Sequence, residues 1–313
     1  KEDFYIGAAS GNDGSFFIQN NNGNFSEEKL KKDTLYEDMG VLLFDADNDN
    51  DLDLYVVSGG SENTEGTAMQ QDRLYMNDGK GNFEYKADAL PGTKASGSCV
   101  VACDYDKDGD LDLFVGGRVV PGSYPLAAKS YLLKNDAGKF SDVSTTELPQ
   151  QGKIGMVTSA LWTDYDNDGW VDLMLVGEFM PITFIKNNHG KIGNQQSEIV
   201  NSSGWWNSIA AADFDEDGDI DYIIGNLGLN TRHKASSKEP LCIYAKDFDK
   251  NGRLDPVMCY YVDGKNYIYP TRDEMIKQIA AMRVRFQSYK DFASVTFEES
   301  FTEADSSMGS GSW

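Results

Sequence analysis

The chain has 313 residues, with 51 Asp and Glu against 28 Lys and Arg, so its formal charge at pH 7 is −23. Nucleic acids and anionic membrane surfaces attract clustered Lys and Arg, so this balance argues against both kinds of partner. Hydrophobic residues make up 40% of the chain, which is enough for a core. No uninterrupted apolar run approaches the length of a membrane helix, which needs about 18 residues. We therefore expect a folded protein with no nucleic-acid partner and no membrane insertion by this chain.

The N-terminal sequence, residues 1–5, lacks the basic and then apolar pattern of a signal peptide. If the protein is exported, we expect its signal to have been removed or to lie outside this sequence. The next segment, Phe16-Phe-Ile-Gln-Asn20-Asn-Asn-Gly23-Asn-Phe25, indicates a strand, an Asn/Gly turn and a short outer strand. Similar segments occur near Asn77, Asn135 and Asn187.

Five nine-residue segments share one aspartate pattern, and their first residues lie 59, 60, 49 and 34 residues apart. We call them loop 1 (45–53), loop 2 (104–112), loop 3 (164–172), loop 4 (213–221) and loop 5 (247–255). The predicted metal ligands are the residues at positions 1, 3, 5, 7 and 9 of each loop. They are Asp45, Asp47, Asp49, Asp51 and Asp53; Asp104, Asp106, Asp108, Asp110 and Asp112; Asp164, Asp166, Asp168, Trp170 and Asp172; Asp213, Asp215, Asp217, Asp219 and Asp221; and Asp247, Asp249, Asn251, Arg253 and Asp255.

The substitutions among the five loops fit the coordination of a hard cation. Positions 1, 3, 5 and 9 always carry a side-chain oxygen, as Ca²⁺ requires, and position 6 is Gly or Asn, which favours a positive φ. Position 7 varies freely, so we expect it to contribute its backbone carbonyl, and the aliphatic position 8 to point into the core. Position 12 carries no Glu and the flanks are not helical, so these are not EF-hands. The alternative interpretation is a set of solvated turns.

We predict up to five Ca²⁺ ions, with the weakest site in loop 5. That loop has Asn251 in place of one carboxylate and Arg253 beside it. Each loop lies between two apolar runs and should therefore cap a β-hairpin. Together with the Asn/Gly turn and its outer strand, this predicts four strands per repeat, which can bury their faces only by stacking on neighbouring repeats. The 34-residue interval before loop 5 is too short for a full repeat, so we expect it to be compressed or re-routed.

The Asp-x-Asp-x-Asp-Gly-x-x-Asp loop, followed by an apolar strand and Asn-x-x-Gly-x-Phe, resembles the FG-GAP/VCBS repeat of the integrin α-subunit propeller. The resemblance covers about residues 1–262. It implies an all-β fold, a β-propeller of four-stranded blades that is typically seven-bladed, with calcium in the loops at one rim. About five blades are visible, which suggests part of a longer protein; the alternative is a smaller ring whose ends meet within one blade. Residues 246–256 and 269–278 are further similar to bacterial surface proteins of the ASPIC/UnbV (cartilage-acidic-protein-like) group.

After the blades, residues 263–305 are predicted to form a hairpin end and a helical insertion, and residues 306–313 a flexible tail or linker. A capping box at Thr271 and an apolar face predict one helix over 271–289, with a second short helix over about 291–303. The first helix either packs on its own blades or forms a lid for a partner. Cys242 and Cys259 flank loop 5 and could lie opposite each other, which leaves a disulfide open; Cys99 and Cys103 lie too far apart along one strand to pair.

Calcium sites of this kind are filled reliably in a calcium-rich medium, which favours an extracellular or cell-surface location. The leading hypothesis is a calcium-stabilised binding scaffold that presents its loops to a protein or glycan partner, with Trp205, Trp206 and Tyr124 as candidate contacts or else core aromatics. A further hypothesis is a subunit of an outer-membrane assembly. The alternative function is a polysaccharide-acting enzyme, a lyase or hydrolase, although Tyr124, Arg232 and His233 form no recognisable catalytic group.

Overall fold

The computed structural model describes residues 3–30, 34–228, 230–232 and 234–301, with the backbone alone for 194–198. The chain divides into two compact units. Unit 1 contains Lys1–Gly122 and Leu126–Asn226, and unit 2 contains Ser123–Pro125 and Leu227–Trp313. The boundary near residue 262, expected from the sequence, stays a prediction. Among the described residues, no helix is both long enough and apolar enough to cross a bilayer.

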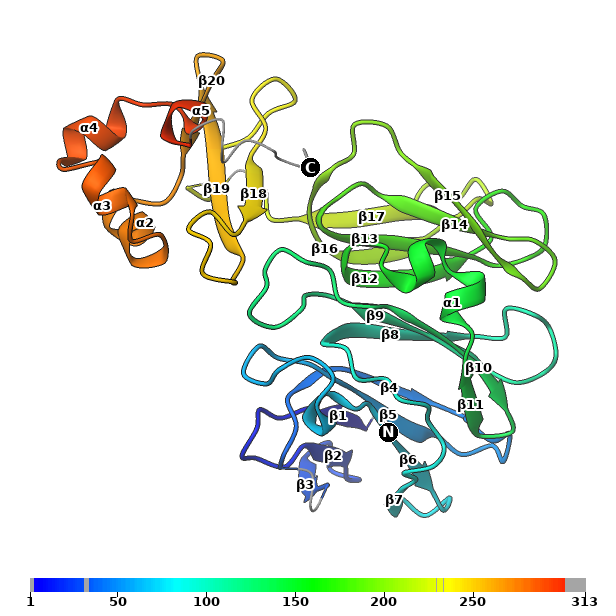
Figure 1. The fold of residues 1–313 in the computed structure, drawn as a ribbon. Coiled ribbons are helices and arrows are strands. Elements are labelled where there is room, and N and C mark those ends of the chain that lie inside the picture. Colours follow the sequence, from blue (N-terminus) through cyan, green and yellow to red (C-terminus); the bar gives the residue numbers. More distant parts are fainter. Residues whose placement is uncertain (1–2, 31–33, 229, 233, 302–313) are drawn as a thin grey trace. The chain divides into compact units, whose positions relative to one another are not determined.

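Unit 1 consists of four antiparallel sheets, with the short helix α1 (Ser144–Glu147) and the 3-10 turns η1 (Ala68–Gln70) and η2 (Pro149–Gly152) between strands (Figure 1). Its strands are β1 (Phe4–Ile6), β2 (Ser15–Gln19) and β3 (Phe25–Lys29) in the first sheet; β4 (Asp38–Phe44), β5 (Asp53–Ser58), β6 (Arg73–Asn77) and β7 (Phe83–Tyr85) in the second; β8 (Gly97–Cys103), β9 (Asp112–Gly117), β10 (Tyr131–Asp136) and β11 (Lys139–Asp142) in the third; and β12 (Met156–Thr163), β13 (Asp172–Met180), β14 (Thr183–Asn187), β15 (Ile192–Glu198), β16 (Gly204–Ala212) and β17 (Asp221–Asn226) in the fourth.

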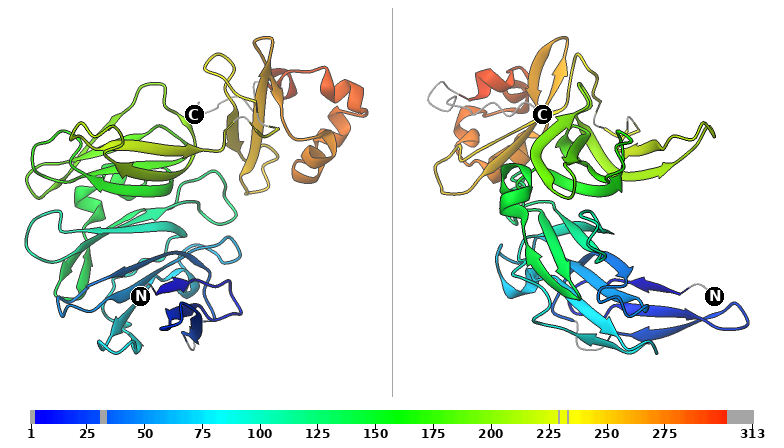
Figure 2. Two further views of the ribbon diagram at one scale, coloured as in Figure 1. Left: turned by 180° about the vertical axis from the view of Figure 1, so that it is seen from behind. Right: turned by 90° about the vertical axis from the view of Figure 1, so that its right-hand side faces the viewer.

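Successive repeats of unit 1 stack through their first strands, because β4 contacts β8, β8 contacts β12, and β12 contacts β16 (Figures 1 and 2). Apolar residues fill the space between neighbouring sheets. One core cluster joins the second sheet to the third and includes Tyr55, Leu74 and Leu133, and the next joins the third to the fourth and includes Phe114 and Leu173. Each sheet therefore buries its face against its neighbour, as expected for stacked repeats.

All five predicted hairpins are present, and each aspartate loop joins their two strands. In every hairpin the residue before position 1 pairs in register with the aspartate at position 9, as Phe44 does with Asp53 and Cys103 with Asp112. The aspartate at position 9 is thus the first residue of the second strand. The expectation that position 8 points into the core is wrong for Leu52 and Ile220, which are each 52% exposed. The second strand begins one residue later, at the aspartate of position 9.

The all-β prediction is confirmed, whereas a closed propeller and its number of blades stay predictions. The repeats that contain loops 1, 2 and 3 have the four strands expected. In the described residues, the repeat of loop 4 has β16 and β17 alone, and β16 continues the previous sheet by pairing with β13. The short interval between loops 4 and 5 thus corresponds to a repeat that departs from the four-stranded pattern in the described residues. On β17, Ile223 is 57% exposed, whereas β5, β9 and β13 are buried throughout.

Unit 2 combines a three-stranded sheet with four short helices. They are β18 (Cys242–Lys246), β19 (Asp255–Val262) and β20 (Lys265–Ile268), followed by α2 (Arg272–Gln278), α3 (Met282–Arg285), α4 (Tyr289–Ala293) and α5 (Phe297–Ser300). Cys242 and Cys259 lie directly opposite each other on β18 and β19 and form a disulfide, with 5.0 Å between their Cα atoms. Cys99 and Cys103 are free thiols, as expected.

The single helix expected over 271–289 is instead the two short helices α2 and α3, and the second helix expected over about 291–303 is instead α4 and α5. Its capping box is present, since the Thr271 side chain accepts from the Glu274 N–H and the Glu274 carboxylate accepts from Thr271 N–H. The backbone becomes extended at Ile279 and Phe286, which turns both apolar side chains into the core with Met275 and Met282. These residues pack against β18–β20, so the helices cover their own sheet, one of the two alternatives that the sequence left open.

One buried carboxylate of unit 1 has an altered protonation equilibrium. Asp72 is 2% exposed and accepts hydrogen bonds from the Tyr55 hydroxyl at 2.9 Å and from Ser58 N–H at 2.8 Å. Burial raises its pKa to about 7, although these hydrogen bonds and the Arg73 charge oppose the shift. Because an unfolded aspartate titrates near about 4, the folded state retains a proton between about pH 4 and pH 7 that the unfolded chain has lost. The free energy of unfolding therefore decreases as the pH rises through this window.

We predict that Asp72→Asn removes this part of the pH dependence. Between about pH 4.5 and pH 7, the melting temperature of the wild type should decrease by several degrees relative to that of the variant. Both proteins are to be melted at one fixed calcium concentration, so that the metal loops contribute equally to each. Melting temperatures that change in parallel over this range would contradict the prediction.

Candidate metal centres

The structure brings carboxylate oxygens together in all five loops, to within 4.8 Å of one another. Positions 1, 3 and 9 converge in four loops, and positions 1, 3 and 5 converge in loop 2. These groups are Asp45, Asp47 and Asp53; Asp104, Asp106 and Asp108; Asp164, Asp166 and Asp172; Asp213, Asp215 and Asp221; and Asp247, Asp249 and Asp255. Among the described residues, the position-7 side chains and the remaining position-5 side chains lie outside these groups.

One pattern of backbone hydrogen bonds holds every loop. The aspartate at position 1 accepts from the N–H groups of positions 5 and 6, as Asp104 does from Asp108 and Gly109, both at 3.1 Å. The oxygen at position 5 accepts from the N–H of position 7, as Asp108 does from Asp110 at 3.1 Å. The same bonds occur in the other four loops. Positions 1 and 5 are therefore structural as well as potential ligands.

Two residues of each loop have a left-handed backbone. Position 6 does so as expected, with φ of 71° at Asn50 and 100° at Gly109. Position 4 does so as well, although it is never glycine: φ is 63° at Asn48 and 61° at Lys107. The positive φ at position 4 could not be predicted from the sequence, because the residue types there (Asn, Lys and Glu) carry no shared signal for it.

The carboxylates at position 9 are the most buried of the loop groups. Asp53 is 1% exposed, and Asp112 and Asp172 are 0% exposed. Burial raises the pKa of Asp53 to about 6 and that of Asp112 to about 7, since desolvation disfavours the ionised form. Each Oδ1 atom accepts from the N–H of the turn asparagine of the same repeat, at 2.7–2.8 Å.

The residues present fit a bound cation, because several buried carboxylate oxygens have no hydrogen-bond partner. They are Oδ1 of Asp47, Asp51 and Asp106 and Oδ2 of Asp112 and Asp172. All of them belong to loops 1–3. A buried anionic oxygen without a donor costs several kcal/mol unless a cation compensates it. Oxygen ligands alone are the donor set of Ca²⁺ or Mg²⁺ rather than of a soft transition metal.

The turn asparagines connect each loop to the loop before it. The Asn135 side chain donates to Ala46 O of loop 1 at 2.8 Å and to Leu111 O of loop 2 at 3.1 Å, and accepts from Gly138 N–H at 2.9 Å. Asn187 repeats this arrangement with Tyr105 O of loop 2 and Val171 O of loop 3. Both asparagines are at most 2% exposed. The sequence marked them as turn residues only, because their partners lie 82 and 89 residues away.

The turn glycines approach the preceding loop closely. A Cβ atom on Gly138 would lie 3.0 Å from Asp47 Cβ, and one on Gly190 would lie 3.2 Å from Asp106 Cβ. Both glycines also have a positive φ, of 85°. Any other residue at these turns would therefore press on the aspartate at position 3 of the neighbouring loop, which explains the glycine at this place in the repeat.

Loops 1, 2 and 3 also contact one another directly. The Asn48 side chain donates to Asp110 Oδ1 at 2.6 Å, and Lys107 Nζ donates to Gly169 O at 2.7 Å. Lys107 Nζ lies 4.1 Å from the centre of the Trp170 ring. Position 4 of one loop thus binds positions 6 and 7 of the next. At position 7 the side chains of Asp110 and Trp170 have this role in packing, in addition to any backbone carbonyl ligand.

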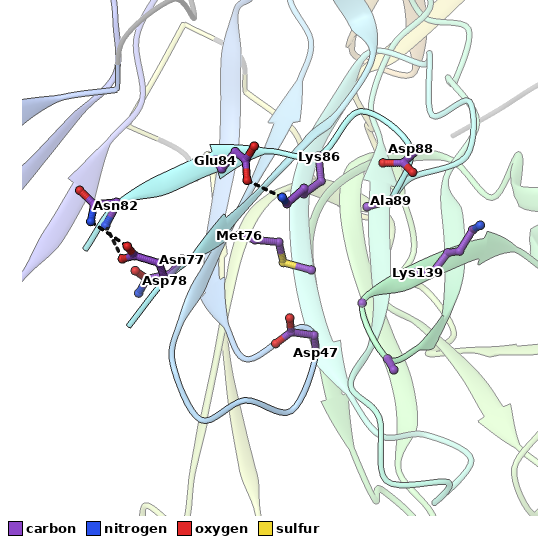
Figure 3. Close-up of a pocket in the computed structure, with 12 residues that line it drawn as sticks. Asp47, Met76, Asn77, Asp78, Asn82, Glu84, Lys86, Asp88, Ala89 and Lys139 are labelled. Atoms are coloured by element: carbon purple, nitrogen blue, oxygen red, sulfur yellow. Dashed lines mark hydrogen bonds and ion pairs between the residues drawn. The ribbon is translucent and has the colours of Figure 1, made fainter. Parts of the chain in front are cut away.

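A surface pocket of about 420 Å³ adjoins loop 1. Figure 3 shows Asp47 and Met76 close together on its wall, with Glu84 paired to Lys86 on another side. Polar residues at the end of β6 and in the turn between β6 and β7 also line it, together with Ala137 and Gly138 before β11. Loop 1 is therefore open to ions from the solvent on this side.

The other candidate residues have varied surroundings. Trp206 Nε1 donates to Ser202 O at 2.9 Å and its ring packs in the core of the fourth sheet, while the Trp205 ring lies 5.0 Å from that of Phe179. The half-buried Tyr124 precedes Pro125. His233 lies outside the described residues. Trp206 is thus a core residue, which is the alternative that the sequence analysis named for it.

Comparison with known protein families supports the repeat assignment. The family model of the FG-GAP-like repeat matches residues 45–115 and 164–224. These two segments contain loops 1–4. A search of curated proteins finds no match.

We predict that Asn135→Ala destabilises unit 1 by about 2–4 kcal/mol, because the buried carbonyls of Ala46 and Leu111 lose their donor. Urea unfolding at saturating calcium measures this loss. The matched control is Asn77→Ala: the Asn77 side chain is partly exposed and donates to Leu52 O of its own repeat at 3.2 Å. Its loss should be clearly smaller. Equal losses in the two variants would show that the bond to the preceding loop contributes nothing.

Proposed function

We propose that these FG-GAP-like repeats form a calcium-stabilised extracellular binding scaffold of the β-propeller type, which presents its loops to a protein or glycan partner. The ASPIC/UnbV-like grouping and a place in an outer-membrane assembly belong to the same proposal. The observation that carries it is the set of buried carboxylate oxygens in loops 1–3 that have no hydrogen-bond partner.

Calcium fits these loops better than magnesium does. Ca²⁺ accepts six to eight oxygens at about 2.3–2.6 Å in flexible geometry, whereas Mg²⁺ requires a near-octahedral site and retains several waters. A loop with up to five oxygen-bearing positions in nine residues provides the larger, crowded ligand set. Positions 1, 3 and 9 would hold the ion in loops 1, 3, 4 and 5, and positions 1, 3 and 5 in loop 2, where Asp112 adds its buried oxygen. The bound ion would supply charge neutralisation and a cross-link between the two strands.

An extracellular location is consistent with the cysteine chemistry of unit 2. The Cys242–Cys259 disulfide closes the hairpin that carries loop 5. Disulfides persist in oxidising compartments and are rare in cytosol. Calcium at extracellular concentrations would also fill sites that cytosolic concentrations leave largely unfilled. Both arguments support a medium outside the cell.

The connections between loops support the proposed function as a scaffold. Asn48, Lys107, Asn135 and Asn187 bind neighbouring loops into one continuous surface. A rigid surface of this kind binds partners with little loss of conformational entropy. Loops that project beside it are then suited to recognition, while the ions hold the framework.

We predict that calcium raises the melting temperature of the protein by at least about 5 °C relative to protein in EDTA. An ion that binds only the folded state stabilises it by about 2.7 kcal/mol at a hundred times its dissociation constant. Differential scanning calorimetry measures the shift, and native mass spectrometry counts the ions. Asp106→Ala should reduce the count by about one. A melting temperature that is the same in calcium and EDTA would refute structural calcium.

We predict that the calcium-loaded chain binds a cell-surface glycan or an extracellular protein on a ligand array, and that EDTA abolishes this binding. Incubation with a panel of surface polysaccharides provides the contrasting measurement. Release of reducing or unsaturated sugar ends that disappears in an Arg232→Ala/His233→Ala variant would favour the enzyme instead. Binding that is unaffected by EDTA would separate the ligand surface from the calcium framework.

A further inference from the structure

The residue just before the turn asparagine differs between repeats in a way that changes the charge of the metal loops. Met76, Lys134 and Lys186 occupy the same register, because Tyr75, Leu133 and Ile185 before them pair with Leu54, Leu113 and Leu173. Two of the three repeats therefore place an ammonium group where the first repeat has a neutral thioether.

Both lysines bind the carboxylates of their own loop. Lys134 Nζ pairs with Asp106 and lies 3.3 Å from Asp108 Oδ2. Lys186 Nζ pairs with Asp166 and lies 2.8 Å from Asp168 Oδ2. In each case the ammonium group binds the carboxylates at positions 3 and 5 of the loop. The sequence alone does not connect these lysines to the loops, since each lies 18 to 28 residues beyond the carboxylates that it binds.

We propose that Lys134 and Lys186 are built-in counter-cations that set the calcium affinity of loops 2 and 3 below that of loop 1. The proposal rests on the calcium-binding function proposed above. In calcium-free protein the ammonium would relieve the repulsion among the loop carboxylates. When calcium binds, the carboxylates that become its ligands must turn from the ammonium to the ion: those at positions 3 and 5 in loop 2 and the one at position 3 in loop 3. The ammonium stays nearby as a like charge.

A second observation shows that the lysines do not complete the loops. Asp112 Oδ2 and Asp172 Oδ2 have no hydrogen-bond partner, and both residues are 0% exposed. Each ammonium group therefore pairs with oxygens of the outer carboxylates, whereas Asp106 Oδ1 and the inner oxygen at position 9 still lack a partner that a cation would supply. Loops 2 and 3 thus combine an internal charge with a remaining cation site, which makes them weaker sites and not lost ones.

Loop 1 has no such ammonium at this register. Met76 is partly buried against the core between the second and third sheets, and it lies beside Asp47 on the wall of the pocket in Figure 3. Asp47 Oδ1 and Asp51 Oδ1 both lack hydrogen-bond partners. The carboxylates of loop 1 are accordingly compensated least, so an arriving divalent ion displaces no internal cation.

The expected size of the effect follows from the exposure of the lysines. Their side chains are 38% and 34% exposed, so solvent screens much of the charge. One screened unit charge within a few ångströms of the ion should change the dissociation constant on the order of tenfold. The same charge should stabilise the calcium-free protein, so its removal has opposite effects with and without calcium.

Native mass spectrometry at graded free calcium tests the proposal on the full chain. We expect Lys134→Met to bind one ion at about tenfold lower free calcium than the wild type, and Lys134→Met/Lys186→Met to bind two ions in this way. Met76→Lys should weaken one ion about tenfold. In EDTA, Lys134→Met should melt a few degrees below the wild type, which a purely structural role of the lysine in the loaded protein would not cause.

Lys134→Arg is the matched control, because it keeps the positive charge and should retain the affinity of the wild type. Unchanged calcium occupancy in Lys134→Met and Met76→Lys, with ions still bound, would overturn this inference alone. Absence of bound calcium in the wild type and in all variants would overturn the proposed function as well.

Discussion

The burial of an aspartate as the first residue of a strand is the constraint on which the metal loops depend. Asp53, Asp112 and Asp172 are at most 1% exposed, and each pairs in register with the residue that precedes its loop. A carboxylate in such a place needs donors or a cation, since desolvation of the charge is costly. The turn asparagine supplies one N–H donor, and in loops 1 and 3 the aspartate also lies within reach of the carboxylates at positions 1 and 3. The register of the two strands therefore also positions a carboxylate of the candidate metal site.

The same constraint connects the repeats to one another. Asn135 and Asn187, which donate to the buried aspartates of their own loops through their backbone, reach the preceding loop with their side chains. Gly138 and Gly190 leave just enough space for that loop. Stability in stacked repeats is a sum of terms within each repeat and between neighbours, and here the terms between neighbours pass through the metal loops themselves. The geometry of one loop is thus coupled to that of the next.

Features that depend on local sequence could be predicted. Five aligned loop sequences show which positions tolerate change, and the hairpins that they predict are present. The Thr271 capping box and the free thiols of Cys99 and Cys103 also agree with the sequence-based expectation. The prediction of a single helix over 271–289 is wrong, because apolar residues three and four apart fit several short helices as well as one long helix. There, extended backbone at Ile279 and Phe286 lets each turn face the core of unit 2.

The sequence by itself determined the loops and their candidate metal ligands, because every carboxylate of a candidate site lies within nine consecutive residues and local spacing fixes their convergence. Only the tertiary structure decided how those sites differ and how they connect. It paired Lys134 and Lys186 with their loops, joined Cys242 to Cys259, and gave the repeat of loop 4 two strands within the part of the chain that the structure describes. These features depend on contacts between segments far apart in the chain, which form when strands pair and sheets stack and which leave no periodic trace in the sequence.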